Sequence, residues 1–265
     1  MTDAEHQAAQ TQTAPTSCDT TSNATVPALE GVPAYAADPG DHEAMLDGFF
    51  TENGDWEKYR TWDDNTTIAS HESLTLRALF DHDAQSRDPK WTIAAYETPV
   101  SGLLWQMTVA AATPAPVLSS LLAVLAAGGA WDAAIGNSIT PRMIAQVTRP
   151  LTDAGWRHTT HGQHSLWQTP PGDAGITLDS SAVSGTGMEL TAWTLWAGPT
   201  VGRPTWAIDA TADTPAGLLA HLAEEIAHGI GTRRTVSRPG PAASRQHTAA
   251  LPPTAPPPRS SASLR

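Results

Sequence analysis

Cysteine, lysine and long apolar runs are scarce in this chain of 265 residues. Cys18 is the only cysteine, which excludes an internal disulfide bond and any metal site built on several thiolates. The longest apolar run, residues 117–127, is interrupted by two serines and is too short to cross a bilayer as a helix. Residues 1–30 contain neither a basic start nor an apolar stretch, so we expect no secretion signal and a cytoplasmic protein without a membrane span.

Phenylalanine and tyrosine are also few, with three of each, whereas tryptophan occurs ten times. Two lysines stand against thirteen arginines, and alanine, threonine and proline are frequent. This bias is typical of coding sequences in high-GC bacteria and carries no information about function.

Positive charge is missing from most of the chain, whose formal net charge is −12. Residues 231–265 contain six arginines and no acidic residue, so residues 1–230 hold 9 basic and 27 acidic side chains, a net charge of −18. Such a body repels a phosphate backbone, which argues against a nucleic-acid reader. The C-terminal arginines leave a weaker hypothesis, in which that segment alone contacts nucleic acid. They are Arg233, Arg234, Arg238, Arg245, Arg259 and Arg265.

Both ends of the chain have few large apolar side chains. Residues 1–40 are rich in Thr, Ala, Ser, Asn and Pro, and residues 232–265 in Arg, Pro, Ser and Ala. Such segments cannot bury enough apolar surface to offset the conformational entropy lost on folding. We therefore expect a disordered N-terminal tail at 1–40 and a disordered C-terminal tail at 232–265, whose proline tract at 251–259 favours polyproline II.

The middle of the chain repeats itself with an offset of 100 to 102 residues, as the printed sequence shows. Trp, Pro and Gly coincide in the two copies as well as aliphatic residues, which makes the register specific. The aligned pairs are Trp56 and Trp156, Thr75-Leu76 and Thr177-Leu178, Trp91 and Trp193, Trp105 and Trp206, Thr113-Pro114 and Thr214-Pro215, and Gly128 and Gly229.

Each copy has the same order of expected elements. An amphipathic helix opens it, at about 43–50 or 141–154. Four strands follow, at about 66–70, 74–77, 91–95 and 105–109 in the first copy and 165–169, 176–179, 193–197 and 206–210 in the second. A last helix begins at Thr113 or Thr214, with threonine as N-cap and proline in the first turn. Gly128 or Gly229 ends it, because glycine can adopt positive φ.

This order predicts an α+β protein of two tandem α-β-β-β-β-α modules, at 41–129 and 138–231, flanked by the two disordered tails. Short connections between consecutive strands favour an antiparallel sheet in each module, with the helices packed on one face and Trp side chains between the layers. The sequence leaves open whether the modules pack together or stay separate, joined at about 129–138.

Several segments of the two copies resemble a known family. They are Leu151-Thr152-Asp153-Ala154-Gly155-Trp156, Ser70-His71-Glu72-Ser73-Leu74-Thr75-Leu76-Arg77, Trp91 to Pro99, and Leu104-Trp105 through Thr113-Pro114 with the helix after it. Together they resemble the actinobacterial SPDY family, domain of unknown function 317, which often occurs as two copies in one chain. The Ser-Pro-Asp-type turn of that family is degenerate here, at residues 70–73 and 169–173. The resemblance supports the fold and implies no activity.

Two groups of histidines have spacings that could serve a metal ion. His158, His161 and His164 are three residues apart, but they are expected in a loop that runs into a strand, where this spacing does not hold one face. His221, Glu224 and His228 share one face of the last helix, opposite its apolar stripe. Neither group recurs in the other copy, so we interpret both as solvated side chains and expect no metal or other cofactor.

Other candidate chemistry is equally weak. Asp81-His82-Asp83 and Asp63-Asp64-Asn65 concentrate oxygen ligands but lack the glycine and final glutamate of a calcium loop. Cys18 lies in a tail, no Ser occupies a Gly-x-Ser-x-Gly elbow, and Gly185-Thr186-Gly187 is too short to hold a phosphate. The sequence therefore favours no catalytic residue, although it leaves the question of an enzyme open.

Tryptophan is the one unusual enrichment. The pairs shared by both copies fall on strand faces that also carry Ile, Leu and Met, which indicates core packing. Trp62, Trp131 and Trp196 lack a Trp counterpart and are the candidates for an aromatic interaction surface. Trp196 also lies on the opposite strand face from Trp193.

The leading hypothesis is a non-enzymatic protein-interaction or structural module with an unidentified protein partner. The alternative is a small-molecule-binding domain or an enzyme with a site between the two repeats. A pocket lined by converging polar groups from both copies would favour the alternative, whereas a flat, exposed Trp patch would favour the first.

Overall fold

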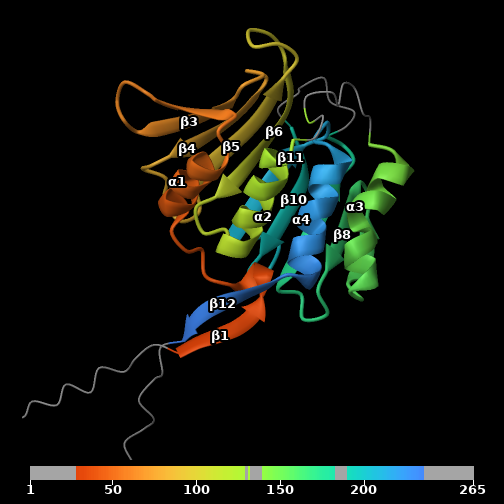
Figure 1. The fold of residues 1–265 in the computed structure, drawn as a ribbon. Coiled ribbons are helices and arrows are strands. Elements are labelled where there is room, and N and C mark those ends of the chain that lie inside the picture. The colour runs from red at the N-terminus through yellow and green to blue at the C-terminus, as the bar shows by residue number, and fades with distance from the viewer. Residues whose placement is uncertain (1–27, 129–130, 132–138, 183–189, 236–265) are drawn as a thin grey trace, which may run out of the picture. The chain divides into compact units, whose positions relative to one another are not determined.

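Each copy of the repeat folds into five antiparallel strands between two helices (Figure 1). The computed structural model describes residues 28–128, 131, 139–182 and 190–235. The first copy comprises α1 (His42–Glu52), β2 (Trp56–Arg60), β3 (Thr66–His71), β4 (Leu76–Asp81), β5 (Pro89–Tyr96), β6 (Leu103–Ala110) and α2 (Ala115–Ala126). The second comprises α3 (Pro141–Asp153), β7 (Arg157–His161), β8 (His164–Gln168), β9 (Ala174–Asp179), β10 (Thr191–Ala197), β11 (Trp206–Thr211) and α4 (Ala216–His228).

The predicted α+β class is confirmed, but each copy has one strand more than the sequence indicates. The additional strands are β2 and β7, which lie at the two outer edges of the sheet. All five residues of β7 and four of the five residues of β2 are exposed. Neither strand therefore shows the alternation of apolar and polar residues that reveals the other strands.

The two copies share one ten-stranded sheet, with the strand order β2-β3-β4-β5-β6-β11-β10-β9-β8-β7. Strands β6 and β11 pair antiparallel at its centre, where Thr108 lies opposite Asp209 and Val109 opposite Ile208. Thr108 and Asp209 are equivalent residues at an offset of 101, so a local two-fold axis passes between them. The modules are not separate beads, which answers the question that the sequence leaves open.

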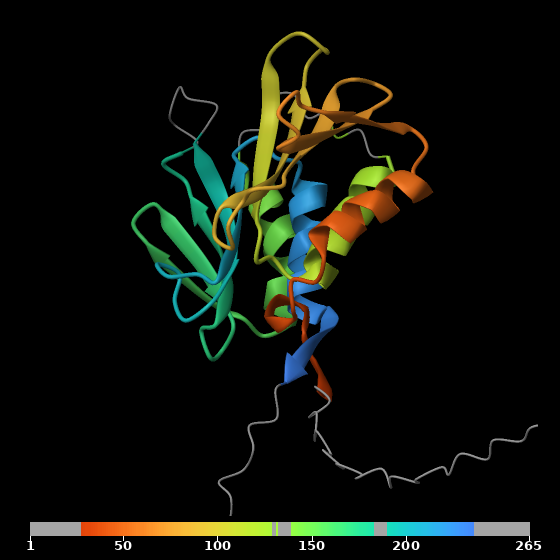
Figure 2. The same ribbon diagram turned by 90° about the vertical axis from the view of Figure 1, so that its left-hand side faces the viewer.

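The helices cover one face of this sheet in the order α1, α2, α4, α3, as Figures 1 and 2 show. Every second residue of the inner strands faces the helices, and Trp91, Trp105 and Trp193 are fully buried on this face. The alternation of each strand and the apolar stripe of each helix thus form one continuous core between sheet and helices. No helix in the described ranges is long and apolar enough to cross a membrane.

The helix ends follow local chemistry, with two corrections to the sequence analysis. Helices α2 and α4 begin one residue later than expected, with Pro114 and Pro215 as N-caps. The threonine before each proline is fully buried, so its side chain packs in the core and forms no cap hydrogen bond. Gly128 has the expected positive φ of 64°, whereas Gly229 is extended, with φ −66° and ψ 152°.

The inner ends of both predicted tails are folded. Strand β1 (Ala28–Pro33) pairs antiparallel with β12 (Ile230–Thr235), and the short 3-10 helix η1 (Ala34–Ala36) follows β1. This pairing joins residues about 200 positions apart, so no local pattern announces it. The rest of the two tails lies outside the described residues, and the module limits 41–129 and 138–231 remain a prediction.

The register between the copies also needs one correction. The pairing of β5 with β4 and of β10 with β9 places Phe80 opposite Trp91 and Leu178 opposite Trp193. Phe80 and Leu178 are therefore equivalent at an offset of 98, which replaces the offset of 102 that the Thr75-Leu76 match suggests. Loop lengths differ between the copies, so a short sequence match can align residues that are not equivalent, whereas the strand pairing identifies the equivalent ones.

Candidate ligand-binding site

The three tryptophans singled out by sequence do not form one surface. Trp62 is completely exposed in the turn between β2 and β3. Trp131 is half-buried, and its backbone oxygen accepts a hydrogen bond of 2.6 Å from Nε1 of Trp105. Trp196 is only 1% exposed. The structure thus presents only one of the three indole rings fully to solvent.

The burial of Trp196 has a local cause. It lies on the sheet face opposite Trp193, as expected, and its cross-strand neighbour on β9 is Gly175. A Cβ atom at Gly175 would approach Cε2 and Cζ2 of Trp196 to 2.9 Å, so the ring lies directly over the glycine. The missing side chain of Gly175 gives the indole a place on the sheet and removes it from solvent.

Within the described residues, no three His, Cys, Asp or Glu side chains are placed so that they could hold a metal ion. His158 stacks on Trp167 at a centroid distance of 4.4 Å in the β7–β8 hairpin, a strand pair rather than the expected loop. His221 donates to or accepts from Ser120 Oγ at 2.8 Å, which links α4 to α2 across the local two-fold axis. Glu224 and His228 are exposed.

The acidic turns are explained by local hydrogen bonds. Asp63 accepts from the Thr61 hydroxyl at 2.6 Å and from the backbone N–H of Asn65 at 3.3 Å. The Thr61 hydrogen bond holds the pKa of Asp63 below its usual value. Asp64 has a φ of 58°, which the tight β2–β3 turn requires. These contacts describe a turn, as the sequence analysis interprets it.

Two arrangements resemble nucleophile, base and carboxylate, but neither offers a reaction site. Thr67 Oγ1 lies 2.9 Å from Nε2 of His82, whose Nδ1 is 3.5 Å from Glu43, yet Thr67 is 1% exposed and closed to a substrate.

In the second arrangement, Ser73 Oγ lies 2.9 Å from Nδ1 of His71, whose Nε2 is 3.3 Å from Asp55. The backbone N–H groups of Ser73, Leu74 and Thr75 all donate within this turn, so none is available to stabilise an oxyanion.

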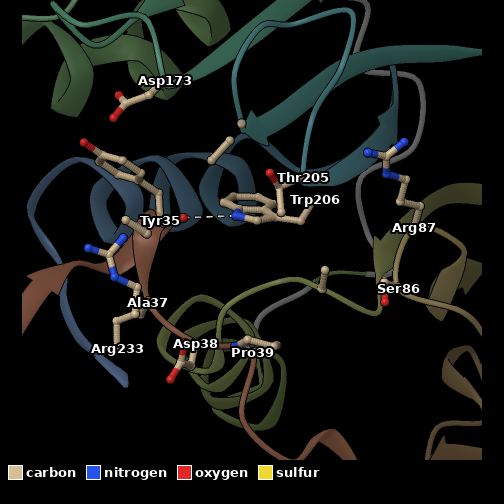
Figure 3. Close-up of a pocket in the computed structure, with 14 residues that line it drawn as sticks. Tyr35, Ala37, Asp38, Pro39, Ser86, Arg87, Asp173, Thr205, Trp206 and Arg233 are labelled. Atoms are coloured by element: carbon tan, nitrogen blue, oxygen red, sulfur yellow. Dashed lines mark hydrogen bonds between the residues drawn. The ribbon is translucent and has the colours of Figure 1, made fainter. Parts of the chain in front are cut away.

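A pocket of about 580 Å³ lies where the two modules meet η1 and β12, and we call it the inter-module pocket (Figure 3). The first module contributes Ser86, Arg87 and Ala112, and the second contributes Asp173 and residues 197–198 and 205–206. Residues 35–39 and Arg233 complete the lining. Its volume is in the range of small-molecule sites in proteins.

Backbone contacts hold the floor and walls of the inter-module pocket. Nε1 of Trp206 donates to the backbone oxygen of Tyr35 at 3.0 Å, which ties η1 to β11. The N–H of Gly198 donates to the oxygen of Asp173 at 2.8 Å. Gly198 has a φ of 149°, and a Cβ there would meet the Thr205 nitrogen and lie 2.9 Å from Cα of Pro204, so only glycine fits.

Charged side chains line the inter-module pocket at opposite sides. Figure 3 shows the Tyr35 hydroxyl turned toward the Asp173 carboxylate, with Arg87 on the other side. Burial, and secondarily the negative charge of Asp173, raise the pKa of Tyr35, so its hydroxyl stays protonated and can donate. Asp173 Oδ1 accepts from the Thr169 hydroxyl at 2.7 Å. The site can therefore hold a small molecule with polar groups at both ends.

No motif in the sequence marks these residues as a binding site. Asp173 belongs to the degenerate turn at 169–173, and Arg233 is one of the C-terminal arginines of the nucleic-acid hypothesis. Arg87 and Arg233 have no motif around them, and Tyr35 lies in a segment assigned to the disordered tail. The pocket depends on the pairing of β6 with β11 and of β1 with β12, both of which are long-range contacts.

The sequence model of SPDY, a domain of unknown function (DUF317), matches residues 72–131 and 151–231. One segment falls in each copy, and together they span more than half of the chain. They include β4 to β6 with α2, and β7 to β11 with α4, whereas β1, α1, β2 and β3 lie outside the match. No curated protein and no solved structure matches the chain. The chain therefore belongs to the SPDY family, of which it carries two tandem copies.

Proposed function

We propose that the protein binds a small polar molecule in the inter-module pocket. The proposal rests on one observation: polar groups from both modules and from the β1–β12 region converge on this pocket. Such pockets between packed units are common ligand sites. Duplication of the module supplies the two facing walls, which gives the tandem arrangement a functional reason.

A variant that fills the pocket tests this proposal. Thr205 lies exposed on the pocket wall, and its side chain forms no hydrogen bond within the described residues. Thr205→Phe should occupy the pocket and abolish the binding of compounds that the native chain selects from a chemically diverse small-molecule library. Ligand-observed NMR would report binding, and thermal unfolding would confirm that the variant is folded.

Thr200→Phe is the matched control, because Thr200 is exposed in the same loop but does not line the inter-module pocket. It should bind the selected compounds as the native chain does. If Thr205→Phe retained binding, or if the folded native chain bound no compound of the library, the proposal would be wrong.

A protein-interaction role is the second candidate, and the exposure of Trp62 supports it. Its indole ring is fully exposed in a turn, and Tyr59 of the same hairpin is 49% exposed. Exposed indoles are enriched among residues that dominate protein interfaces. A partner captured from a host extract by the native chain but lost with Trp62→Ala would support this role, and equal capture by both would count against Trp62.

The nucleic-acid hypothesis concerns residues that lie mostly outside the described ranges. Arg233 and Arg234 are part of β12, and Arg233 forms an ion pair of 3.3 Å with Glu30. A deletion that tests the hypothesis should therefore begin at residue 236, which leaves β12 intact. Salt-sensitive DNA binding that disappears with this deletion would support the hypothesis, and undiminished binding would contradict it.

A further inference from the structure

Arg87 differs from the other charged residues of the inter-module pocket. Asp38 accepts a hydrogen bond of 2.8 Å from the backbone N–H of Arg234, Asp173 is bonded to Thr169, and Arg233 is paired with Glu30. The guanidinium of Arg87 forms no hydrogen bond or ion pair with any described residue, although it lines the pocket. Its five N–H donors are therefore available to a ligand.

A second arginine lies beside the same wall. A smaller cavity of about 160 Å³ is lined by Arg87 and Arg203 and shares Thr205 and Trp206 with the inter-module pocket. Arg203 comes from the β10–β11 loop of the second module, and Arg87 from the β4–β5 loop of the first. The side chain of Arg203, like that of Arg87, has no polar partner in the described part of the chain. The two modules thus supply one unpaired guanidinium each to adjoining cavities.

Both loops are held by their backbones. The oxygens of Ser86 and Asp88, on either side of Arg87, accept hydrogen bonds of 3.0 and 3.1 Å from the N–H groups of Ala112 and Ala111. The N–H of Arg203 donates to the oxygen of Thr200 at 3.0 Å within its own turn. Anchored loops of this kind present their side chains with little loss of backbone entropy on binding.

From this placement, and resting on the proposed function, we propose that Arg87 and Arg203 bind an oxyanion of the ligand, a phosphate or a carboxylate. Guanidinium groups match the geometry of both anions and bind them through paired hydrogen bonds. Residues 1–230 carry a net charge of −18, so the two guanidinium groups form a local cationic edge on an otherwise acidic body, where an anionic group can bind. The other polar groups of the ligand lie toward Asp173 and the Tyr35 hydroxyl.

The test titrates the full chain with two simple probes, sodium pyrophosphate and sodium citrate, at an ionic strength held constant with sodium chloride. Amide NMR spectra would follow Thr205 and Ala207, which line the smaller cavity. At least one probe should bind saturably and change the chemical shifts of these two amides. Arg87→Gln and Arg203→Gln should each weaken it about tenfold or more, as expected for a lost charged hydrogen bond. The probe that binds distinguishes a phosphate from a carboxylate.

Arg142→Gln is the control for net charge, because Arg142 is exposed on α3 and does not line either cavity. The Arg142→Gln variant should bind the anionic probe with the affinity of the native chain. The proposal would be overturned if neither probe saturated, or if all three variants weakened binding equally. A library compound that Thr205→Phe excludes but Arg87→Gln and Arg203→Gln bind unchanged would leave the small-molecule function standing and refute the oxyanion site.

Discussion

His42 is the buried titratable side chain that joins the first helix to the core. Its Nε2 lies 2.9 Å from the backbone oxygen of Thr113, and its Nδ1 accepts from Nε1 of Trp91 at 3.3 Å. This pair of contacts requires the neutral ring with the proton on Nε2, because Nδ1 must keep its lone pair. The imidazole is only 4% exposed, and its burial lowers its pKa from 6.5, despite the opposing effect of the Thr113 hydrogen bond.

The lowered pKa predicts that acid destabilises the fold through His42. The unfolded chain binds a proton at this residue below about pH 6.5, whereas the folded chain resists it, so the contribution of His42 to stability is present above that pH. It is lost as the pH falls from 6.5 through the lower pKa of the folded state. In urea titrations over about three pH units around the ordinary pKa of histidine, from about pH 8 to about pH 5, His42→Gln should lose stability less steeply than the native chain.

His161→Gln is the matched control, because His161 is exposed in the β7–β8 hairpin. Its stability should depend on pH as that of the native chain does. A native-like slope in His42→Gln would show that other groups cause the acid sensitivity.

Residues of the core were predictable from the sequence, and residues of the pocket were not. Trp91, Trp105 and Trp206 alternate with polar neighbours, and all three are buried as predicted. Trp196 lies on the other face of β10 and is buried over Gly175 of β9, which no pattern within β10 reveals. Arg87 is an isolated arginine in the sequence, and only the fold brings it beside Arg203.

Among the elements, the two helices that close the modules end in physically different ways. Gly128 follows α2 with positive φ, and a Cβ there would meet nothing within 4 Å. Gly229 follows α4 in an extended conformation and donates to the backbone oxygen of Glu225 at 2.7 Å. A Cβ at Gly229 would overlap that same oxygen and lie 2.7 Å from Cδ of Glu225. The first glycine is needed for its dihedral angle and the second for space.

This difference predicts opposite tolerance of asparagine, the residue other than glycine that most readily adopts positive φ. Gly128→Asn should lower the free energy of unfolding by less than about 1 kcal/mol, since it preserves the conformation without a clash. Gly229→Asn should lower it by about 1–3 kcal/mol, as expected for a steric overlap with backbone. Urea denaturation measures both values. Equal losses would show that the two helix ends do not differ in this way.

The elements that sequence reasoning located are those with one buried face. Strands β5, β6, β10 and β11 show the alternation, and the stripes of α2 and α4 reveal both helices. The edge strand β7 is exposed throughout, and β1 has one buried residue among six. Such strands are stabilised by backbone pairing with a distant partner, and their own side chains carry almost no signal of it.

At the scale of the whole molecule, the local two-fold axis relates contacts at the centre of the interface between the modules. Thr108 faces its equivalent Asp209 on the sheet, and Ser120 faces its equivalent His221 between α2 and α4. Equivalent residues meet in the same way in a symmetric dimer of identical subunits. The full chain therefore has the geometry of such a dimer, joined into one polypeptide.

The axis predicts how each module behaves when it is expressed alone. In residues 39–128, β6 can pair with β6 of a second copy, because Thr108 would face Thr108. In residues 139–229, the same dimer through β11 would bring Asp209 against Asp209, and like charges directly opposite destabilise a strand pair. Light scattering after gel filtration should find the first fragment dimeric and the second not. Asp209→Thr should restore the dimer of the second fragment, and failure of that rescue would refute the explanation.

The β1–β12 ribbon has a mechanical consequence. Ala28 and Thr235 are register partners at its outer end, and six residue pairs lead from there to Pro33 and Ile230 beside the core. Tension applied to the molecule through the chain preceding Ala28 and following Thr235 would separate these two strands pair by pair, starting at their outer end. It would load the inter-strand hydrogen bonds one after another and leave the ten-stranded sheet unstressed until the last had parted. Because Arg233 lies on β12 and lines the inter-module pocket, a pull of this kind would remove one lining residue from the pocket before it unfolded either module.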